Sequence, residues 1–276
     1  MNADAPPPPD WPALWDEVLR VRAATASVSE LNAQGLSPGS AALLSLYRPL
    51  LGSAWCVAQL GQSLDGCVAT HSGDSYFVTG GESLLHLHRL RALCDAVLVG
   101  AGTVMADNPL LTTRRVPGPS PTRVVLDPAA RLDGRARVFT EAQATTLWLC
   151  DARHAPAARA ALASGPAEVV AIEGLLDAGG AWHPERVVAA LAARGLQRLF
   201  VEGGGVTVSR FMAAGCLDRL HLVVAPVLIG AGRRGLQLPP WATMADCPRP
   251  PAQRVVLGDD TLWDLDLRAA QPPLRS

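Results

Sequence analysis

Lysine is missing from this sequence of 276 residues: all 24 basic residues are arginine. A chain without lysine cannot form a lysine Schiff base, and it cannot carry the lysine of a P-loop. Anionic ligands must therefore be bound by arginine, by hydroxyl groups or by backbone N–H groups.

Excess charge, cysteine motifs and long apolar runs are also missing. The formal net charge is −1, which gives no electrostatic reason to expect nucleic acid or an anionic membrane as a partner. No apolar run reaches the length of a membrane span, and the N-terminus lacks a signal-peptide pattern. The six cysteines are scattered without a C-x-x-C, which favours buried thiols over metal ligands or disulfides. We expect a cytoplasmic protein without a metal site.

Strands and helices alternate along most of the chain. We expect residues 1–10 to be a disordered, proline-rich tail and residues 11–52 to be a helical extension packed outside the main domain. From residue 53 to residue 270, apolar strands alternate with helices, which predicts one three-layer α/β domain with a mostly parallel sheet. A hairpin over residues 254–267 adds antiparallel strands at the end.

A glycine triplet stands at the centre of this pattern. The apolar residues Leu199–Val201 predict a short strand that ends at Glu202, and Gly203–Gly205 lead into a helix. Glycines let a ligand approach the first N–H groups of the helix, whose dipole favours an anion there. A tight turn with an exposed glutamate would fit the triplet equally well.

Two further sets of polar residues have helical spacing. Thr103 and Asp107 lie four residues apart after a second strand–glycine–helix pattern, whereas His86 and His88 lie two apart on a predicted helix. Residues four apart share a helix face and residues two apart do not, so the histidine pair makes a poor metal site. We expect packing or solvation for these histidines.

Seven motifs, taken in order, resemble one known family. They are Ser63-Leu-Asp-Gly66, Ser72-Gly-Asp-Ser75, His88-Arg-Leu-Arg91, residues 98–112 (LVGAGTVMADNPLLT), Arg123-Val-Val-Leu-Asp127, Val201-Glu-Gly-Gly204 and Ala225-Pro-Val-Leu-Ile-Gly230. This series, over residues 54–268, resembles the reductase half of the bacterial bifunctional riboflavin-biosynthesis deaminase–reductase. The resemblance implies a dihydrofolate-reductase-like fold, NADPH as cofactor, and reduction of 5-amino-6-(5-phosphoribosylamino)uracil to its ribitylamino product. It also implies a homodimer, for which strand 219–225 and the terminal hairpin could form an interface.

The resemblance also assigns substrate-binding residues. It places the substrate phosphate near Arg91 and Arg114, with Ser75 and the backbone of Leu111 beside it, and it turns Glu202 toward the ribose and pyrimidine. Arginine suits this role because it binds phosphate bidentately. A solvated loop at Arg114 is the structural alternative.

Cofactor contacts are assigned in the same way. The resemblance places NADPH against Gly61, Phe77, Thr103 and Asp107, although local capping and pairing would also explain the last two. The pyrophosphate would lie on the turn made by Gly203, Gly204, Gly205, Val206, Thr207, Val208, Ser209 and Arg210.

Three positions depart from the family pattern. Gln59 stands where the family usually has a lysine expected to touch substrate, and Phe77 stands where tryptophan is usual. Pro128 replaces a serine expected near the 2′-phosphate of NADPH, a loss for which Arg131 or Arg153 could compensate.

The deaminase half is not expected in this chain. An H-x-E followed by P-C-x-x-C, which would bind the deaminase zinc, does not occur. We therefore expect a stand-alone NADPH-dependent reductase. Two alternatives stay open: a paralogue that reduces another substrate such as a pterin, which the change at Gln59 favours, and a nucleotide-binding protein without turnover.

Overall fold

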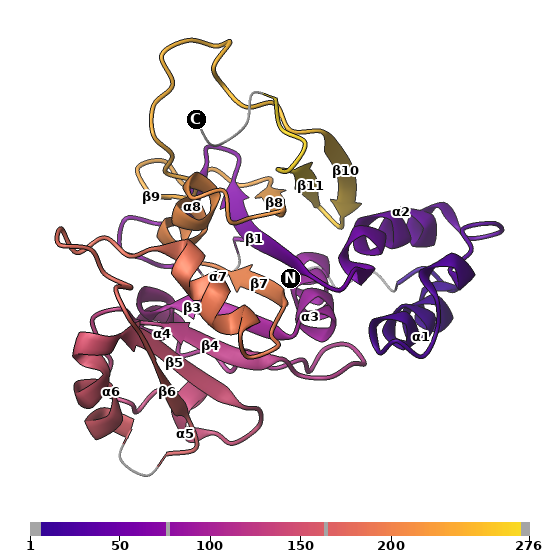
Figure 1. The fold of residues 1–276 in the computed structure, drawn as a ribbon. Coiled ribbons are helices and arrows are strands. Elements are labelled where there is room, and N and C mark those ends of the chain that lie inside the picture. Colours follow the sequence, from indigo (N-terminus) through magenta and orange to yellow (C-terminus); the bar gives the residue numbers. More distant parts are fainter. Residues whose placement is uncertain (1–6, 76–77, 163–164, 272–276) are drawn as a thin grey trace.

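The computed structural model describes residues 7–75, 78–162 and 165–271. A sheet forms the middle of the molecule (Figure 1). Its strands are β1 (Trp55–Ser63), β3 (Ala96–Gly100), β4 (Thr122–Leu126), β5 (Thr146–Asp151), β6 (Glu168–Ile172), β7 (Arg198–Glu202), β8 (Arg219–Ala225), β10 (Ala252–Leu257) and β11 (Asp260–Asp266). Their order is β10-β11-β8-β1-β7-β3-β4-β5-β6. Neighbours from β8 to β6 are parallel and the hairpin is antiparallel, which confirms the predicted mixed sheet.

Helices cover both faces of this sheet. One face packs against α1 (Trp11–Arg22), α2 (Pro38–Tyr47), α3 (Gly81–Leu93), α4 (Ala101–Asp107), α5 (Arg137–Thr140) and α6 (Ala155–Leu162). The other face packs against α7 (Pro184–Ala192) and α8 (Gly205–Ala213). Short 3₁₀ turns, η1 (Val28–Glu30), η2 (Arg48–Leu51) and η3 (Ala152–His154), complete the helical structure. The predicted three-layer class is confirmed.

The two apolar cores follow from strand alternation. In β1, Trp55 and Val57 belong to the cluster beneath α1–α6, whereas Cys56, Ala58 and Leu60 belong to the cluster beneath α7 and α8. Successive side chains of a strand point to opposite faces, so a strand buried on both faces is apolar throughout. Polar residues within such a strand need a specific explanation.

The N-terminal helices share a core with the sheet. The side chains of Trp11, Trp15 and Tyr47 are buried in the same apolar cluster as residues of β1, β3 and β7. Ser37 caps α2, as Ser40 N donates to its hydroxyl, and a proline opens the helix. Both helices lie within the predicted helical extension of residues 11–52, and they pack directly on the main domain.

Part of the expected disordered tail is structured. Residues 1–6 lie outside the described residues, but the carboxylate of Asp10 accepts hydrogen bonds from Ser37 and Ser40 at 2.7–2.8 Å. These bonds lower the pKa of Asp10 to about 2. The prediction of disorder is therefore wrong at Asp10, because the composition of the proline run gave no sign of a partner 27 residues away.

Three further details were not expected. A short strand, β9 (Arg233–Arg234), pairs with β2 (Cys67–Ala69) outside the main sheet. The helix α5 lies between β4 and β5. Strand β8 lies between β1 and β11, so it is not an edge strand that could extend the sheet into a second copy. Within the described residues, no helix is long and apolar enough to cross a membrane.

Candidate active site

The glycine triplet forms a turn that only glycine can make. Gly203 and Gly204 have φ values of +69° and +68°, in the left-handed region. A Cβ on Gly205 would lie 2.1 Å from the carbonyl oxygen of Gly235. Backbone this close leaves no room for any side chain, and no side chain caps the start of α8 within this described segment. The N–H groups of its first turn therefore have no capping side chain.

A second glycine turn lies beside the first. Strands β3 and β7 are neighbours, and each runs into a helix, α4 or α8, at the same edge of the sheet. A Cβ on Gly100 would lie 2.7 Å from Thr207 Oγ1, and one on Gly204 would lie 3.1 Å from Thr103 Oγ1. The paired turns form a cradle of backbone and hydroxyl groups, which suits a phosphate-bearing ligand.

Glu202, at the end of β7, is bound by an arginine from α3. Arg91 Nε donates to Glu202 Oε2 at 2.8 Å, and its NH2 group donates to Oε1 at 2.5 Å. The remaining terminal nitrogen of Arg91 donates to the carbonyl of Thr112 at 3.0 Å. Arg91 is 4% exposed, so this bidentate pair is almost entirely out of water. All three guanidinium nitrogens of Arg91 already have partners.

The loop of residues 108–121 lies against this pair. Two of its residues, Asn108 and Leu111, have left-handed backbone with φ of +42° and +59°, and Leu111 is fully buried. Left-handed conformation in residues other than glycine is costly and occurs often at functional sites. The backbone N–H of Arg114 donates to His88 Nδ1 at 3.2 Å, while the Arg114 side chain is exposed.

Positive charge predominates around the loop. Burial, together with the nearby charges of Arg91 and Arg114, lowers the pKa of His88 to about 3, so the ring is neutral. Burial and the charges of Arg91 and Arg115 also lower the pKa of Arg114. Asp107 is exposed at the surface, yet neighbouring atoms desolvate its carboxyl enough to raise its pKa, and the charge of Glu202 adds to this. An anionic group bound beside Arg114 would be stabilised by this potential.

Comparison with known proteins assigns the fold and these motifs to a family. The family model described as the RibD C-terminal domain matches residues 54–245. The chain belongs to this family.

Relatives in the RibD family include both short and long proteins. The 2,5-diamino-6-ribosylamino-4(3H)-pyrimidinone 5′-phosphate reductase of Methanothermobacter thermautotrophicus is 35% identical over 64% of this chain and 79% of its own. The riboflavin biosynthesis protein RibD of Bacillus amyloliquefaciens is also 35% identical, over 65% of this chain but only 47% of its own. This chain therefore spans about half the length of that relative.

Solved structures in the RibD family have the same fold. A Thermotoga maritima protein, a diaminohydroxyphosphoribosylaminopyrimidine deaminase/5-amino-6-(5-phosphoribosylamino)uracil reductase, superposes with a TM-score of 0.64. At 24% identity, the alignment covers 78% of this chain and 56% of the other. The likeness places the present chain on the reductase fold.

The structure brings most of the predicted substrate residues together. Arg91, Leu111, Arg114 and Glu202 surround the Thr112 carbonyl and the end of β7. Ser75 is exposed in the segment between β2 and α3, with a backbone contact to Val78. The structure therefore gathers four of the five and leaves Ser75 apart from their hydrogen bonds.

The predicted cofactor residues divide more sharply. Thr103 faces Gly204, while Phe77 lies outside the described residues. Gly61 packs against Thr79, whose Cγ2 atom would lie 2.7 Å from a Cβ on Gly61. Within α8, Thr207 is largely buried and Val206 is 56% exposed. The last three residues of the predicted stretch turn elsewhere. Val208 is buried in the core, Ser209 accepts from the backbone N–H of Gln237, and Arg210 lies over the ring of Trp182. Because these three side chains have other partners, only the first turn of α8 is left for a cofactor among the residues of this predicted stretch.

Gln59, where the resemblance led us to expect a lysine, lies beside Glu202. The register pairs Gln59 with Glu202 of β7 on one side and with His221 of β8 on the other, and His221 with Asp264 of β11. Residues paired in this way point to the same face, so the four form a polar row beneath α3. Gln59 is 7% exposed, and its Oε1 has no hydrogen-bond partner among the described residues. The family motif drew attention to Gln59 but gave no sign of the row.

His221 belongs to a buried hydrogen-bonded chain. Tyr47 Oη lies 2.7 Å from His86 Nδ1, and His86 Nε2 lies 3.0 Å from His221 Nδ1. His221 Nε2 lies 3.3 Å from Asp264 Oδ1. Burial lowers the pKa of His86 well below its usual value, so a neutral chain fits, in which Tyr47 donates to His86 and His86 to His221. The His-x-His pair thus packs, as expected.

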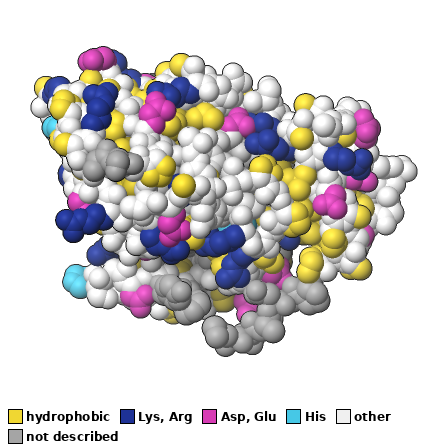
Figure 2. All heavy atoms as spheres, turned by 90° about the horizontal axis from the view of Figure 1, so that it is seen from below, with side chains coloured by type: hydrophobic (Ala, Val, Ile, Leu, Met, Phe, Trp, Pro, Cys, Tyr) yellow, Lys and Arg dark blue, Asp and Glu magenta, His cyan; other side chains and the backbone are white. Residues whose placement is uncertain are grey.

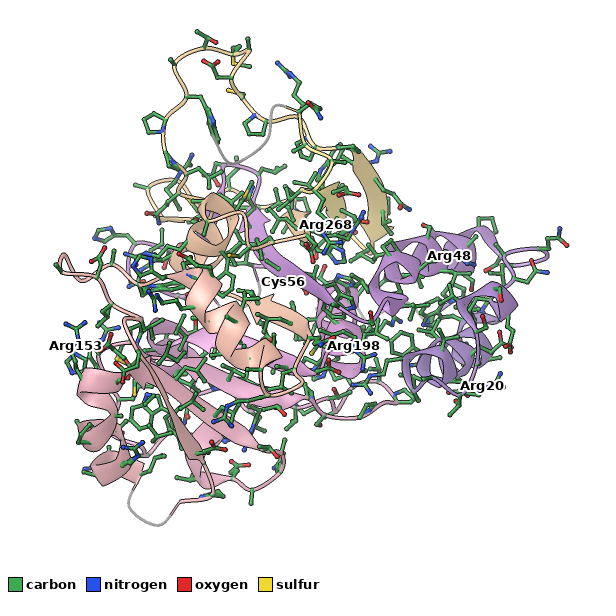
Figure 3. The ribbon with its side chains drawn as sticks, in the orientation of Figure 1. Arg20, Arg48, Cys56, Arg153, Arg198 and Arg268 are labelled. Carbon is green, nitrogen blue, oxygen red and sulfur yellow. The ribbon has the colours of Figure 1, made fainter. Side chains whose placement is uncertain are left out.

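The two arginines proposed to bind the 2′-phosphate of NADPH have different surroundings. Arg153, beside α6 in Figure 3, donates to the buried carboxylate of Asp151 and to the Leu176 carbonyl. Arg131 is mostly exposed, and among the described residues it forms one long ion pair, of 3.7 Å, to Asp127. Arg131 is therefore the more available of the two for a ligand.

Two of the sequence motifs, Ser63–Gly66 and Ala225–Gly230, also have a structural role. The carboxylate of Asp65, in Ser63-Leu-Asp-Gly66, accepts from the N–H groups of Ile229 and Gly230 at 2.6–3.2 Å. A hydrogen bond from Ser63 and these two N–H groups lower the pKa of Asp65 to about 2. Two motifs that lie 164 residues apart thus close on each other.

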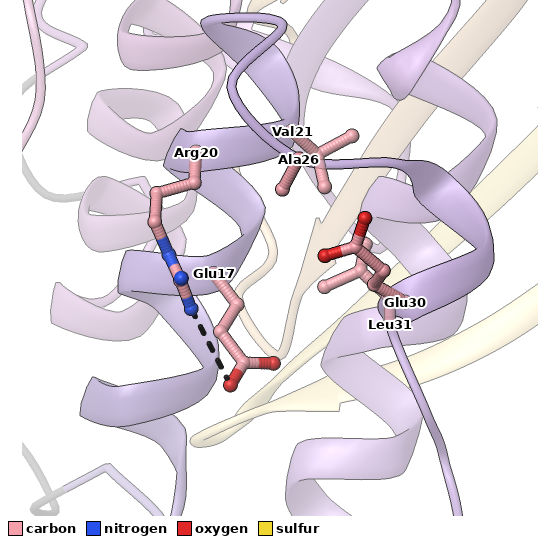
Figure 4. A pocket seen from close by; sticks show the side chains of 6 residues that line it. All are labelled: Glu17, Arg20, Val21, Ala26, Glu30 and Leu31. Atoms are coloured by element: carbon pink, nitrogen blue, oxygen red, sulfur yellow. Dashed lines mark ion pairs between the residues drawn. The ribbon is translucent and has the colours of Figure 1, made fainter.

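Other surface features lack catalytic character. A hollow of about 150 Å³ lies beside α1 (Figure 4) and contains an exposed Glu17–Arg20 ion pair. It is lined by Glu17, Arg20, Val21, Ala26, Glu30 and Leu31. Over the described residues, no cluster of histidine, cysteine and carboxylate side chains could hold a metal ion.

Proposed function

We propose that this chain is an NADPH-dependent oxidoreductase that reduces 5-amino-6-(5-phosphoribosylamino)uracil to the ribitylamino product in riboflavin biosynthesis. The observation that carries the proposal is the meeting, at one sheet edge, of the paired glycine turns and the Arg91–Glu202 pair with Arg114. The archaeal relative, a pyrimidinone phosphate reductase, and the Bacillus relative, a riboflavin biosynthesis protein, support the same pathway.

Substrate binding is divided between the two arginines. Arg91 is 4% exposed and each of its guanidinium nitrogens donates within the protein, so its role is to hold the Glu202 carboxylate in one orientation toward the sugar and pyrimidine. Among the described residues, the Arg114 guanidinium makes only long hydrogen bonds, of 3.4–3.5 Å, to Thr112. It is therefore the group that receives the phosphate, which changes the expectation that both arginines contact the phosphate directly.

The cofactor fits the paired turns. The first turn of α8 would hold the pyrophosphate through backbone N–H groups, and Thr103 would lie beside it across the Gly204 cradle. When bound, NADPH supplies the hydride that converts the ribosyl carbon to its reduced form. Arg131 is the candidate for the 2′-phosphate, since Arg153 is committed to Asp151.

A second candidate is reduction of a different heterocycle, such as a pterin. The observation in its favour is Gln59, whose neutral amide, with one unpartnered oxygen, replaces a cation beside Glu202. A nucleotide-binding protein without turnover is the third candidate. Oxidation of NADPH, followed in the steady state with the phosphoribosylamino substrate and with dihydrofolate, separates the three.

The matching variant test uses two adjacent arginines. Arg114→Ala should lower kcat/KM for the phosphorylated substrate by roughly tenfold, the effect of one charge-assisted hydrogen bond at an exposed site. Arg115→Ala is the control. It removes the same positive charge from the loop, but from the residue next to the one that is proposed to bind the phosphate. Equal losses in both variants would show that only the local charge matters, and the phosphate contact of Arg114 would be wrong.

The remaining proposals concern binding partners, the oligomeric state and the cellular compartment. We propose a cytoplasmic homodimer that acts on a small phosphorylated molecule and not on nucleic acid. On the face drawn in Figure 2, arginine side chains lie interspersed with acidic and apolar ones. The hairpin exposes Val256 and Trp263, at 65% and 40%, on the outer strands of the sheet, and the mass in solution tests whether a second copy covers them.

A further inference from the structure

The loop of residues 108–121 is fixed at several points by other elements. All of its residues are described, and none lies in a helix or strand. Two anchors come from α3: Arg91 donates to the Thr112 carbonyl, and His88 accepts from the Arg114 N–H. A third comes from α1, where Trp15 Nε1 donates to the carbonyl of Pro117 at 2.9 Å.

Helix α1 also packs against the loop backbone. Gly118 has a φ of +137°, and a Cβ there would lie 2.6 Å from Ala92 Cβ and 3.3 Å from Leu19 Cδ2. The loop is therefore wedged between α1, which carries Leu19, and the end of α3, which carries Ala92. Figure 1 shows the segment after α4 reaching toward α1.

Helix α1 is itself held rigidly. Trp15 is 2% exposed and packs at centroid distances of 5.9 Å from Trp11 and 5.6 Å from Tyr47. At its other end, Arg22 donates to the Cys94 carbonyl, and Arg198 donates to the Arg22 carbonyl, each at 3.1 Å. A helix fixed to both the core and the sheet can hold a loop in one place.

We propose that α1 positions the phosphate-binding loop, and that Trp15 is the positioning residue through which it acts. The inference rests on the proposed function only for its kinetic consequence. Left-handed Leu111 is a strained conformation, which persists only where the surroundings determine the backbone. The Pro117 bond supplies such a constraint three residues after Arg114, and a pre-organised loop binds its ligand without an ordering cost.

The test compares two tryptophans of the same helix. Trp15→Phe removes the indole N–H that reaches Pro117 but keeps an aromatic ring in the cluster. Trp11→Phe makes the same change in volume at a site that is 3% exposed and packs on Arg89 of α3. Both variants should lose some thermal stability, since each leaves a small cavity.

Two readouts distinguish positioning from general stability. In Trp15→Phe, hydrogen exchange at the amides of Thr113 and Arg114 should become at least roughly fivefold faster, about the contribution of one hydrogen bond. The KM for the phosphorylated substrate should rise by roughly threefold to tenfold, with kcat and the Kd for NADPH unchanged. In Trp11→Phe, exchange in the loop and KM should stay at the wild-type values.

The outcomes separate this inference from the proposed function. Exchange is measured without substrate, so it decides the positioning role even if the wild-type protein does not reduce the proposed substrate. Equal exchange and equal KM in the two tryptophan variants would overturn the inference. If Trp15→Phe does not fold, Gly118→Ala disturbs the packing of the loop against Leu19 of α1 and Ala92 of α3, and unchanged exchange at Arg114 would overturn the inference as well.

Discussion

Lowering the pH from 7 to 5 should destabilise the folded protein through His88. Its side chain is fully buried on α3, and its Nδ1 atom accepts from the N–H of Arg114. Burial and the charges of Arg91 and Arg114 lower its pKa from 6.5 to about 3. Protons therefore bind the unfolded chain more strongly, and the stability from His88 is present above pH 6.5 and lost as the pH falls toward 3.

The size of this effect follows from the two pKa values. Between pH 7 and pH 5 the unfolded ring becomes protonated, while the folded ring, with a pKa of about 3, stays neutral. Linkage then gives a loss of about 2 kcal/mol, or nearer 1 kcal/mol if water reaches the ring. His86, also buried with a lowered pKa, changes stability in the same direction.

Urea unfolding at pH 7 and at pH 5 measures this loss, with His88→Asn as the variant. The asparagine oxygen can accept from Arg114 but does not titrate, so the variant should lose about 1–2 kcal/mol less than wild type over the same interval. His71→Asn removes an exposed histidine and serves as the control. If His88→Asn kept the full pH dependence of wild type, the account of a neutral, buried His88 would be refuted.

Two further predictions concern the glycine turn and the buried pair. Gly204→Asp should weaken NADPH binding, measured by nicotinamide fluorescence, because a side chain meets Thr103 Oγ1 and a carboxylate repels the pyrophosphate. Gly195→Asp, at a similar φ of +78° with no close neighbour, should leave the affinity unchanged. In a double-mutant cycle, Arg91→Met and Glu202→Gln should each cost about 3–5 kcal/mol in unfolding free energy, and the double variant much less than their sum, whereas simple additivity would disprove the pair.

Local pattern was enough to predict most elements of the fold. The apolar run at 96–99 and the glycines after it predict a strand and a turn. Four consecutive apolar residues and glycines that lack Cβ can both be read from the segment itself. The predicted strand agrees with β3 to within one residue. The short strand β9 has only two exposed arginines and no such signal, so it was not predicted.

Contacts across the sheet could not be predicted in the same way. Arg91 and Glu202 are 111 residues apart, and only the position of α3 over β7 brings them together. The sequence identified both residues but assigned Arg91 to the phosphate, because its pairing depends on tertiary structure. His221 was not singled out at all, since its place beside Gln59 depends on the order of β8, β1 and β7.

The order of β8, β1 and β7 explains why glutamine suits position 59, where the resemblance led us to expect lysine. Glu202 is already neutralised by Arg91, and Arg114 adds a further positive charge nearby. A lysine at position 59 would lie in the same row, between Glu202 and His221, and would place a second positive charge beside a carboxylate that already pairs with Arg91. A neutral amide avoids this repulsion and offers a donor and an acceptor instead. In the proposed function, the charge that binds the phosphate would come from the loop, while the sheet would present hydrogen-bonding groups to the uncharged part of the substrate.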